Sequence, residues 1–201
     1  DAAAEASANA HAAFDAVADE ATGSALGKFI EYVGLPDGAL ADEGRLCDLI
    51  VMAKPQGRTA HQLQSISIAA AQSGRPVLLL PPQRDAAAPF ERVAIAWDGS
   101  LEAMRAMVGA LPMLQAAGSV SILHAGGDAG ASDKLAAIAR YLDLHGVTAT
   151  THSIDLEGRS AARTLIEAAT AGQADLLVMG GFGAPLLLRA IGRDETSALI
   201  D

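Results

Sequence analysis

Two short segments of the sequence carry residues that suit the binding of a polar or anionic ligand. Gly180-Gly-Phe-Gly183 directly follows one apolar run, and Asp98-Gly-Ser100 follows another. Glycines let backbone N–H groups approach an anion closely, and the dipole of a following helix adds a favourable field. The carboxylate of Asp98 has the chemistry to accept a hydrogen bond from a ribose hydroxyl or an adenine amine.

Each segment also has a purely structural interpretation. A Gly-x-x-Gly after a buried strand is often only a tight turn. Asp98 or Ser100, followed by Glu102, would suit the N-cap of a helix. Trp97 would either flank an adenine ring or pack in the core, and His124 is expected to be a hydrogen-bonded structural residue. These alternatives stay open at the level of sequence.

The elements that must position these residues alternate between strand and helix patterns. Strands are expected at 28–33, 48–52, 75–80, 92–97, 120–124, 147–154 and 175–179. Helices are expected at 1–21, 36–45, 59–72, 101–117, 132–145 and 160–171, with a kink at Pro112. Continuous apolar runs are typical of strands buried on both faces, so the alternation predicts an α/β protein with parallel sheets. Ligands of such sheets bind at the carboxyl ends of strands.

An internal repeat divides the chain. Cys47-Asp-Leu-Ile-Val-Met-Ala53 matches Ala174-Asp-Leu-Leu-Val-Met-Gly180, at an offset that suits a duplicated small domain. We therefore predict a first domain at 1–83 that lacks its opening strands and a second at 90–201 that lacks its last strand. Asp48 and Asp175 recur in both copies and are expected to cap the entrances of strands. Cys47 is expected to be a small core residue.

The second copy resembles a universal stress protein domain. The strand that ends in Asp98-Gly-Ser100, the strand that ends in Leu123-His-Ala125 and the segment from Gln173 to Gly183 carry this resemblance. The first copy is similar to the later part of the same domain, with 74–80 as its last strand. The resemblance implies two flavodoxin-like, Rossmann-like parallel-sheet domains in tandem.

Nucleotide-binding members of that family carry a Gly-x-x-Gly, a spacer, then a Gly followed by Gly or Ser, and a Thr shortly after. The contacts that the resemblance implies here are Asp98, Ala125, Met179, Gly180, Gly183, Gly192 and Thr196. Gly192 is displaced by one place, and Arg193-Asp194 stand where the family has Gly and Ser. A carboxylate there would repel phosphate by about 1 to 4 kcal/mol, whereas Arg193 would pair with it. The first copy has 53–58 in place of this loop and looks degenerate.

The resemblance implies a stress-response protein that binds ATP, ADP or AMP in its second domain, with Mg²⁺ accompanying ATP. Such a protein would act by regulated association, as a homodimer or by pairing of its two domains. The alternative is an interaction module that no longer binds nucleotide, which Arg193-Asp194 favours. No Walker loop, nucleophile elbow or pair of nucleophile and base is seen in the sequence, so we expect no enzymatic activity.

Composition and charge argue against several other classes of protein. The 201 residues include 24 acidic and 14 basic side chains, for a net charge of −10, and 3% are aromatic. Such a chain repels phosphate backbones and lacks stacking platforms, so no nucleic-acid partner is expected. One cysteine and five histidines without ligand spacing predict no metal site. No apolar run is long enough for a transmembrane helix and no basic leader region is visible, so we expect a cytoplasmic protein without a membrane partner.

Overall fold

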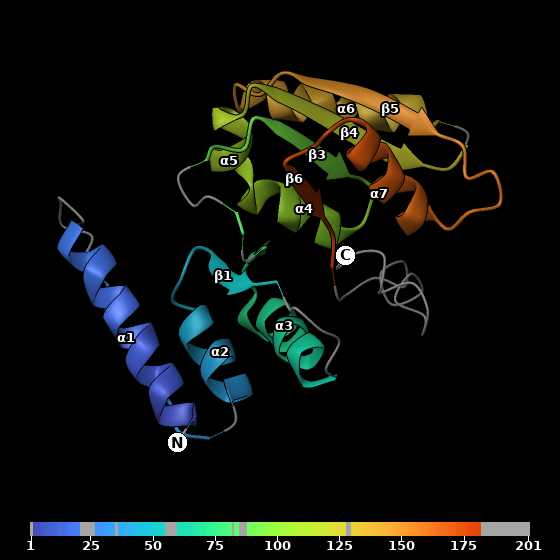
Figure 1. Cartoon of the computed structure of the whole chain (residues 1–201). Coiled ribbons are helices and arrows are strands. Elements are labelled where there is room, and N and C mark those ends of the chain that lie inside the picture. The colour runs from blue at the N-terminus through green and yellow to red at the C-terminus, as the bar shows by residue number, and fades with distance from the viewer. Residues whose placement is uncertain are drawn as a thin grey trace.

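The computed structural model describes residues 2–20, 27–34, 36–54, 60–81, 83–84, 88–127 and 130–181 (Figure 1). The elements follow in the order α1 (Ala2–Glu20), α2 (Pro36–Gly44), β1 (Ile50–Ala53), α3 (Ala60–Ser73), β2 (Val77–Leu80), β3 (Arg92–Ala96), α4 (Leu101–Gly109), α5 (Leu111–Ala116), β4 (Ser119–Ala125), α6 (Ala131–Leu144), β5 (Ala149–Ile154), α7 (Ala161–Ala171) and β6 (Leu176–Met179). The predicted α/β class is confirmed.

The described strands form two separate sheets, and every pair of neighbouring strands is parallel. In the first sheet β1 pairs with β2, with Ile50 opposite Val77. In the second sheet the order is β5-β4-β3-β6, so β6, the last described strand, lies beside β3, the first strand of this sheet (Figure 1). The near-identical strands β1 and β6 therefore stand in different sheets. The domain limits at 83 and 90 stay a prediction.

The second sheet is covered on both faces. Helices α4, α5 and α6 pack on one face, and α7 packs on the other over Ala94 and Leu123. The largest fully buried apolar side chains of this part are Val93, Ile95, Met107, Leu114, Ile122 and Leu142. Burial on both faces is why β3 and β6 read as continuous apolar runs rather than as alternating ones.

Asp175 joins the amino ends of β3 and β6. Its Oδ2 accepts from the backbone N–H of Glu91 at 3.0 Å and of Arg92 at 2.8 Å, and its Oδ1 pairs with the Arg92 guanidinium at 3.1 Å. The N–H bond from Arg92 contributes most to holding the pKa of the Asp175 carboxyl below its ordinary value of 3.8. The expected capping role of Asp175 is confirmed. Asp48 is exposed and shows no such contact among the described residues.

The expected strand at 28–33 is wrong. Residues 27–33 form no ladder, because no neighbouring strand lies beside them in the described part of the chain. The Phe29 ring instead stacks on His11 of α1, with ring centroids 4.4 Å apart, and Val33 is fully exposed. A strand pattern in sequence produces a strand only where a partner exists.

Two further local expectations need correction. The helix expected over 101–117 is two helices, α4 and α5, which meet at Ala110. Pro112 has no N–H to continue the helical ladder, and it stands in the first turn of α5, where none is needed. Cys47 is exposed rather than buried, because it lies in the turn between α2 and β1, where its Sγ donates to the carbonyl of Glu43 at 3.5 Å.

Candidate functional site

The carboxyl ends of β3, β4 and β6 lie at one edge of the second sheet. Ala96 of β3 is opposite Leu123 of β4 and Met179 of β6, so the residues that follow all emerge together. Four predicted site residues stand at this edge: Asp98, Ala125, Met179 and Gly180. The predicted site residues Gly183, Gly192 and Thr196, and the pair Arg193-Asp194, lie outside the described residues.

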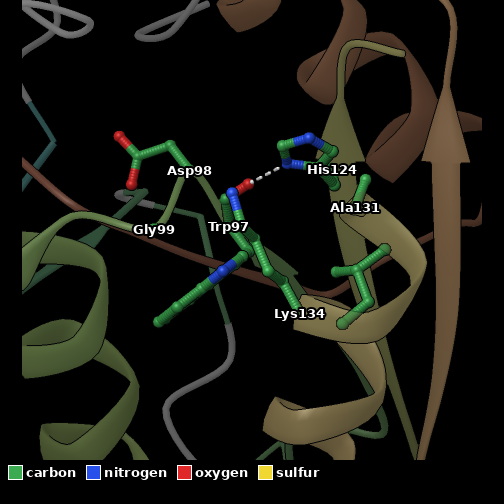
Figure 2. A pocket seen from close by; sticks show the side chains of 7 residues that line it. Trp97, Asp98, Gly99, His124, Ala131 and Lys134 are labelled. Atoms are coloured by element: carbon green, nitrogen blue, oxygen red, sulfur yellow. Dashed lines mark hydrogen bonds between the residues drawn. The ribbon is translucent and has the colours of Figure 1, made fainter. Parts of the chain in front are cut away.

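A small pocket opens at this edge, between the ends of β3 and β4 and the first turn of α6 (Figure 2). It is lined by Trp97, Asp98, Gly99, His124, Ala131, Lys134 and Leu135. The cavity measures about 50 Å³, which is room for a few water-sized groups. It therefore suits one moiety of a ligand, with the remainder lying along the sheet edge outside it.

His124 ties the ends of β3 and β4 together at the pocket wall. Its Nδ1 lies 2.9 Å from the carbonyl oxygen of Trp97, a bond drawn in Figure 2. A carbonyl oxygen only accepts, so Nδ1 carries the ring proton. The backbone N–H of Trp97 also donates to Leu123 at 2.8 Å. This geometry agrees with the structural role expected for His124 and holds the Trp97 backbone in place beside the pocket.

Asp98 and Ser100 begin α4. Oδ1 of Asp98 accepts from the backbone N–H of Ser100 at 2.9 Å, and Oγ of Ser100 accepts from the N–H of Ala103 at 3.1 Å. The N-cap interpretation of Ser100 is thus confirmed. A carboxylate has about four acceptor positions, so the exposed Asp98 retains capacity for a ligand. Figure 2 shows its side chain directed away from the His124 ring.

Gly180 lies directly against the first turn of α4. A Cβ placed on Gly180 would stand 2.7 Å from the backbone nitrogen of Ala103 and 3.0 Å from the carbonyl carbon of Glu102. Only a residue without a side chain allows this approach. The glycine therefore brings the backbone after β6 next to the first turn of α4. In the first repeat the corresponding residue is Ala53.

Three lining residues, Ala131, Lys134 and Leu135, were not singled out by the sequence analysis, and Lys134 is the charged one. It stands in the first turn of α6, which follows Gly130 (φ 86°) and has no side-chain cap. The uncapped N–H groups of that turn and the Lys134 ammonium both favour negative charge. A signal was present in the sequence: Lys134 is the basic residue nearest the start of the helix that follows the strand ending at His124.

The described part of the chain shows neither a cluster of metal ligands nor a helix that could span a membrane. There, no three His, Cys, Asp or Glu side chains gather as a cation site would require. Among the same residues, no helix combines the length and apolar character needed to cross a bilayer.

The comparisons with known proteins identify the fold. No protein-family model matches the sequence, and no curated protein matches it significantly. A universal stress protein from Archaeoglobus fulgidus aligns with 98% of this chain and 73% of its own, at 17% identity and a TM-score of 0.71. The chain therefore has the fold of that protein, as the resemblance in sequence predicted.

Two shorter structures align with part of the chain. A universal stress protein family member from Burkholderia pseudomallei covers 51% of this chain and 91% of its own, at 21% identity and a TM-score of 0.39. A universal stress protein from Lactobacillus plantarum covers 57% and 92%, at 17% identity and a TM-score of 0.45. The arrangement of the chain as two tandem domains, each incomplete, stays a prediction.

Proposed function

We propose that this chain is a stress-response protein of the universal stress protein type, and that it binds an adenine nucleotide at the carboxyl edge of the second sheet. The observation that carries the proposal is the pocket at the ends of β3 and β4, within that fold. Binding at the carboxyl ends of strands is the general rule for open α/β sheets.

The residues around the pocket fit the parts of a nucleotide. Trp97 and Leu135 offer apolar surface to a purine, and Asp98 offers acceptors to a ribose hydroxyl. Ala125 and Met179 end the strands on which the nucleoside would rest. The phosphates would extend past Gly180, and the further phosphate contacts that the resemblance implies, Gly183, Gly192 and Thr196, lie outside the described residues. Lys134 adds positive charge at the pocket, which matters in a chain with a net charge of −10.

The chain offers a direct reporter of binding. Trp97 is the only tryptophan of the sequence and lines the pocket, so its fluorescence reports contact with an adenine ring. We expect ATP or AMP to change this fluorescence with a stoichiometry near one per chain. Calorimetric titration of the same samples gives the affinity without relying on the indole.

Lys134→Met tests the role of the pocket. Loss of a charged contact to the ligand costs about 1.5–3 kcal/mol, so we expect the affinity to fall by about tenfold or more. Arg140→Met is the matched control, because Arg140 is an exposed basic residue of the same helix that does not line the pocket. A folded protein that gives neither heat nor a fluorescence change at millimolar ATP would overturn the proposal.

An interaction module without nucleotide binding is the second candidate. Two observations favour it: the cavity is small, and Asp98 already accepts a hydrogen bond from Ser100. Association that is unchanged by saturating ATP would support this candidate. We propose binding rather than catalysis in either case. That view would be contradicted if the protein turned over nucleotide faster than buffer alone does and if Asp98→Asn abolished this turnover.

A further inference from the structure

We propose that α4 couples the carboxyl edge of the second sheet to the first sheet, through a close contact between Gly109 and Pro76. Nucleotide bound at the edge alters this contact, and a change at the contact alters the affinity of the edge. The coupling regulates the nucleotide site and rests on the proposed function for its ligand. The contacts that carry it join described residues and need no ligand to form.

The start of α4 is built from residues of the pocket. Asp98 and Gly99 line the cavity, and Oδ1 of Asp98 accepts from the N–H of Ser100 at 2.9 Å. Ser100 in turn caps the helix, because its Oγ accepts from the N–H of Ala103 at 3.1 Å. A ligand hydroxyl that donates to the Asp98 carboxylate acts on the same group that orients this cap. The position of the first turn of α4 is therefore linked to the occupancy of the site.

The helix itself transmits a displacement from one end to the other. α4 has nine residues and is about 13 Å long, and its backbone hydrogen bonds make it move as one unit. Its first turn has no room to move toward β6, because a Cβ on Gly180 would already stand 2.7 Å from the backbone nitrogen of Ala103. Ala103 and Met107 are buried against the sheet, so the helix is also held along its length. A shift of the first turn therefore appears at Gly109, the last residue of α4.

The last residue of α4 lies against the first part of the chain. A Cβ on Gly109 would stand 2.7 Å from Cγ and 2.9 Å from Cβ of Pro76. Gly109 belongs to the helix and has no positive φ, and at such a position glycine is less favourable than alanine. The close approach of Pro76 is what requires a residue without a side chain here. Figure 1 shows α4 on the side of the second sheet that faces the first.

Pro76 is anchored in the first sheet. It directly precedes β2, and its carbonyl accepts at 3.0 Å from the N–H of Ile50, the first residue of β1. The guanidinium of Arg75, just before it, donates to the carbonyl of Arg45 at 2.9 Å. The proline ring fixes its own φ, so it cannot rotate away from α4 as a flexible side chain would. A displacement of α4 is therefore carried to β1 and β2.

Gly109→Ala tests the coupling from the end of α4 that does not touch the pocket. The added Cβ pushes α4 away from Pro76 and strains the cap at Asp98, so we expect the affinity for ATP in calorimetric titration to fall about 2–30-fold. Pro76→Gly removes the ring that the new methyl group meets. The affinity of Gly109→Ala/Pro76→Gly should therefore lie within about twofold of that of Pro76→Gly alone. Gly38→Ala is the matched control, because a Cβ on this residue of α2 meets nothing within 4 Å, and it should leave the affinity unchanged.

Hydrogen exchange of the Ile50 N–H measures the coupling in the opposite direction. This N–H belongs to the first sheet and donates to the carbonyl of Pro76. We expect saturating ATP to slow its exchange by about twofold or more in the parent protein, because a bound ligand that fixes α4 also fixes Pro76. The effect should be lost in Pro76→Gly. Circular dichroism of each variant establishes that it is folded.

Trp97 provides a readout that needs no ligand, because it is the only tryptophan of the chain and lies just before the start of α4. Gly109→Ala should shift its emission in the ligand-free protein, and adding Pro76→Gly should reverse the shift. If this response is seen but no variant binds ATP, the proposed function fails and the coupling stands. If folded Gly109→Ala changes neither the emission of Trp97 nor the affinity for ATP, Pro76 yields without moving α4 and the coupling is refuted.

Discussion

Gly180→Ala tests how closely the end of β6 packs against the first turn of α4, at the carboxyl edge of the second sheet. The added Cβ would stand 2.7 Å from the backbone nitrogen of Ala103, 3.0 Å from the carbonyl carbon of Glu102 and 3.1 Å from the Ala103 Cα. All three atoms belong to the backbone of the first turn of α4, so no side chain can rotate out of the way. The end of β6 or the start of α4 must move.

The size of the effect follows from these distances. Ordinary van der Waals contact begins near 3.4 Å, so the two segments must separate by roughly 0.7 Å, and overpacking of this kind costs about 1–3 kcal/mol. For a chain of this length each kcal/mol lowers Tm by about 2–4 °C, which gives a fall of about 2–12 °C. Thermal and urea unfolding of Gly180→Ala measure both quantities.

A double-mutant cycle with Ser100→Ala locates the displacement. The Ser100 hydroxyl accepts from the Ala103 N–H at 3.1 Å, and loss of such a cap costs about 1 kcal/mol. If the new methyl pushes the first turn of α4 away, this bond is already weakened, and Ser100→Ala should cost less in the Gly180→Ala background. Unchanged stability of Gly180→Ala, together with strict additivity in the cycle, would refute the reasoning.

Two further predictions concern stability. Gly38→Ala should stabilise the protein by about 0.5–1 kcal/mol in urea unfolding, because a Cβ on this residue of α2 meets nothing within 4 Å and the helix gains from alanine; a loss of stability would contradict this. Asp175→Asn should lower stability at pH 7. The folded-state pKa of Asp175 is depressed, so its contribution is present above the ordinary value of 3.8 and is lost as pH falls through the lower folded-state pKa. Unfolding curves of the variant and the parent should therefore converge in acid, and a constant difference at all pH values would count against the ion-pair account.

Sequence patterns predicted β3 and β6 of the second sheet well because their apolar side chains pack on both faces of the sheet. Runs such as 92–97 and 175–179 have few alternatives to a parallel strand, and their neighbours follow from the alternation with helices. The segment 28–33 has an equally strand-like sequence but forms no ladder. Hydrogen-bond partners of a strand come from elsewhere in the chain, so local pattern alone does not reveal whether one is present.

The candidate site likewise contains residues that the sequence indicated and residues that it did not. The resemblance implied Asp98, Ala125, Met179 and Gly180 as contacts, and the structure places all four at the common carboxyl edge of the parallel strands. Lys134 was missed, because which turn of α6 reaches that edge depends on how the helix packs on the sheet. The sequence also left open whether Asp98 or Ser100 caps α4, since both residue types suit an N-cap, and the structure assigns the cap to Ser100.

The two repeats place nearly the same strand sequence in two different surroundings. Asp175, just before β6, accepts hydrogen bonds from the amino end of β3, and Gly180, just after β6, packs against α4. β6 lies next to β3, with its carboxyl end at the same edge as the end of β3. β1 has the same aspartate in solvent and an alanine in place of the glycine. A Cβ at Gly180 would stand 2.7 Å from the backbone nitrogen of Ala103, whereas the methyl group of Ala53 lies at an exposed position of β1. Glycine is therefore required only in the copy whose strand ends against α4, and the aspartate is bonded only in the copy whose strand lies beside β3.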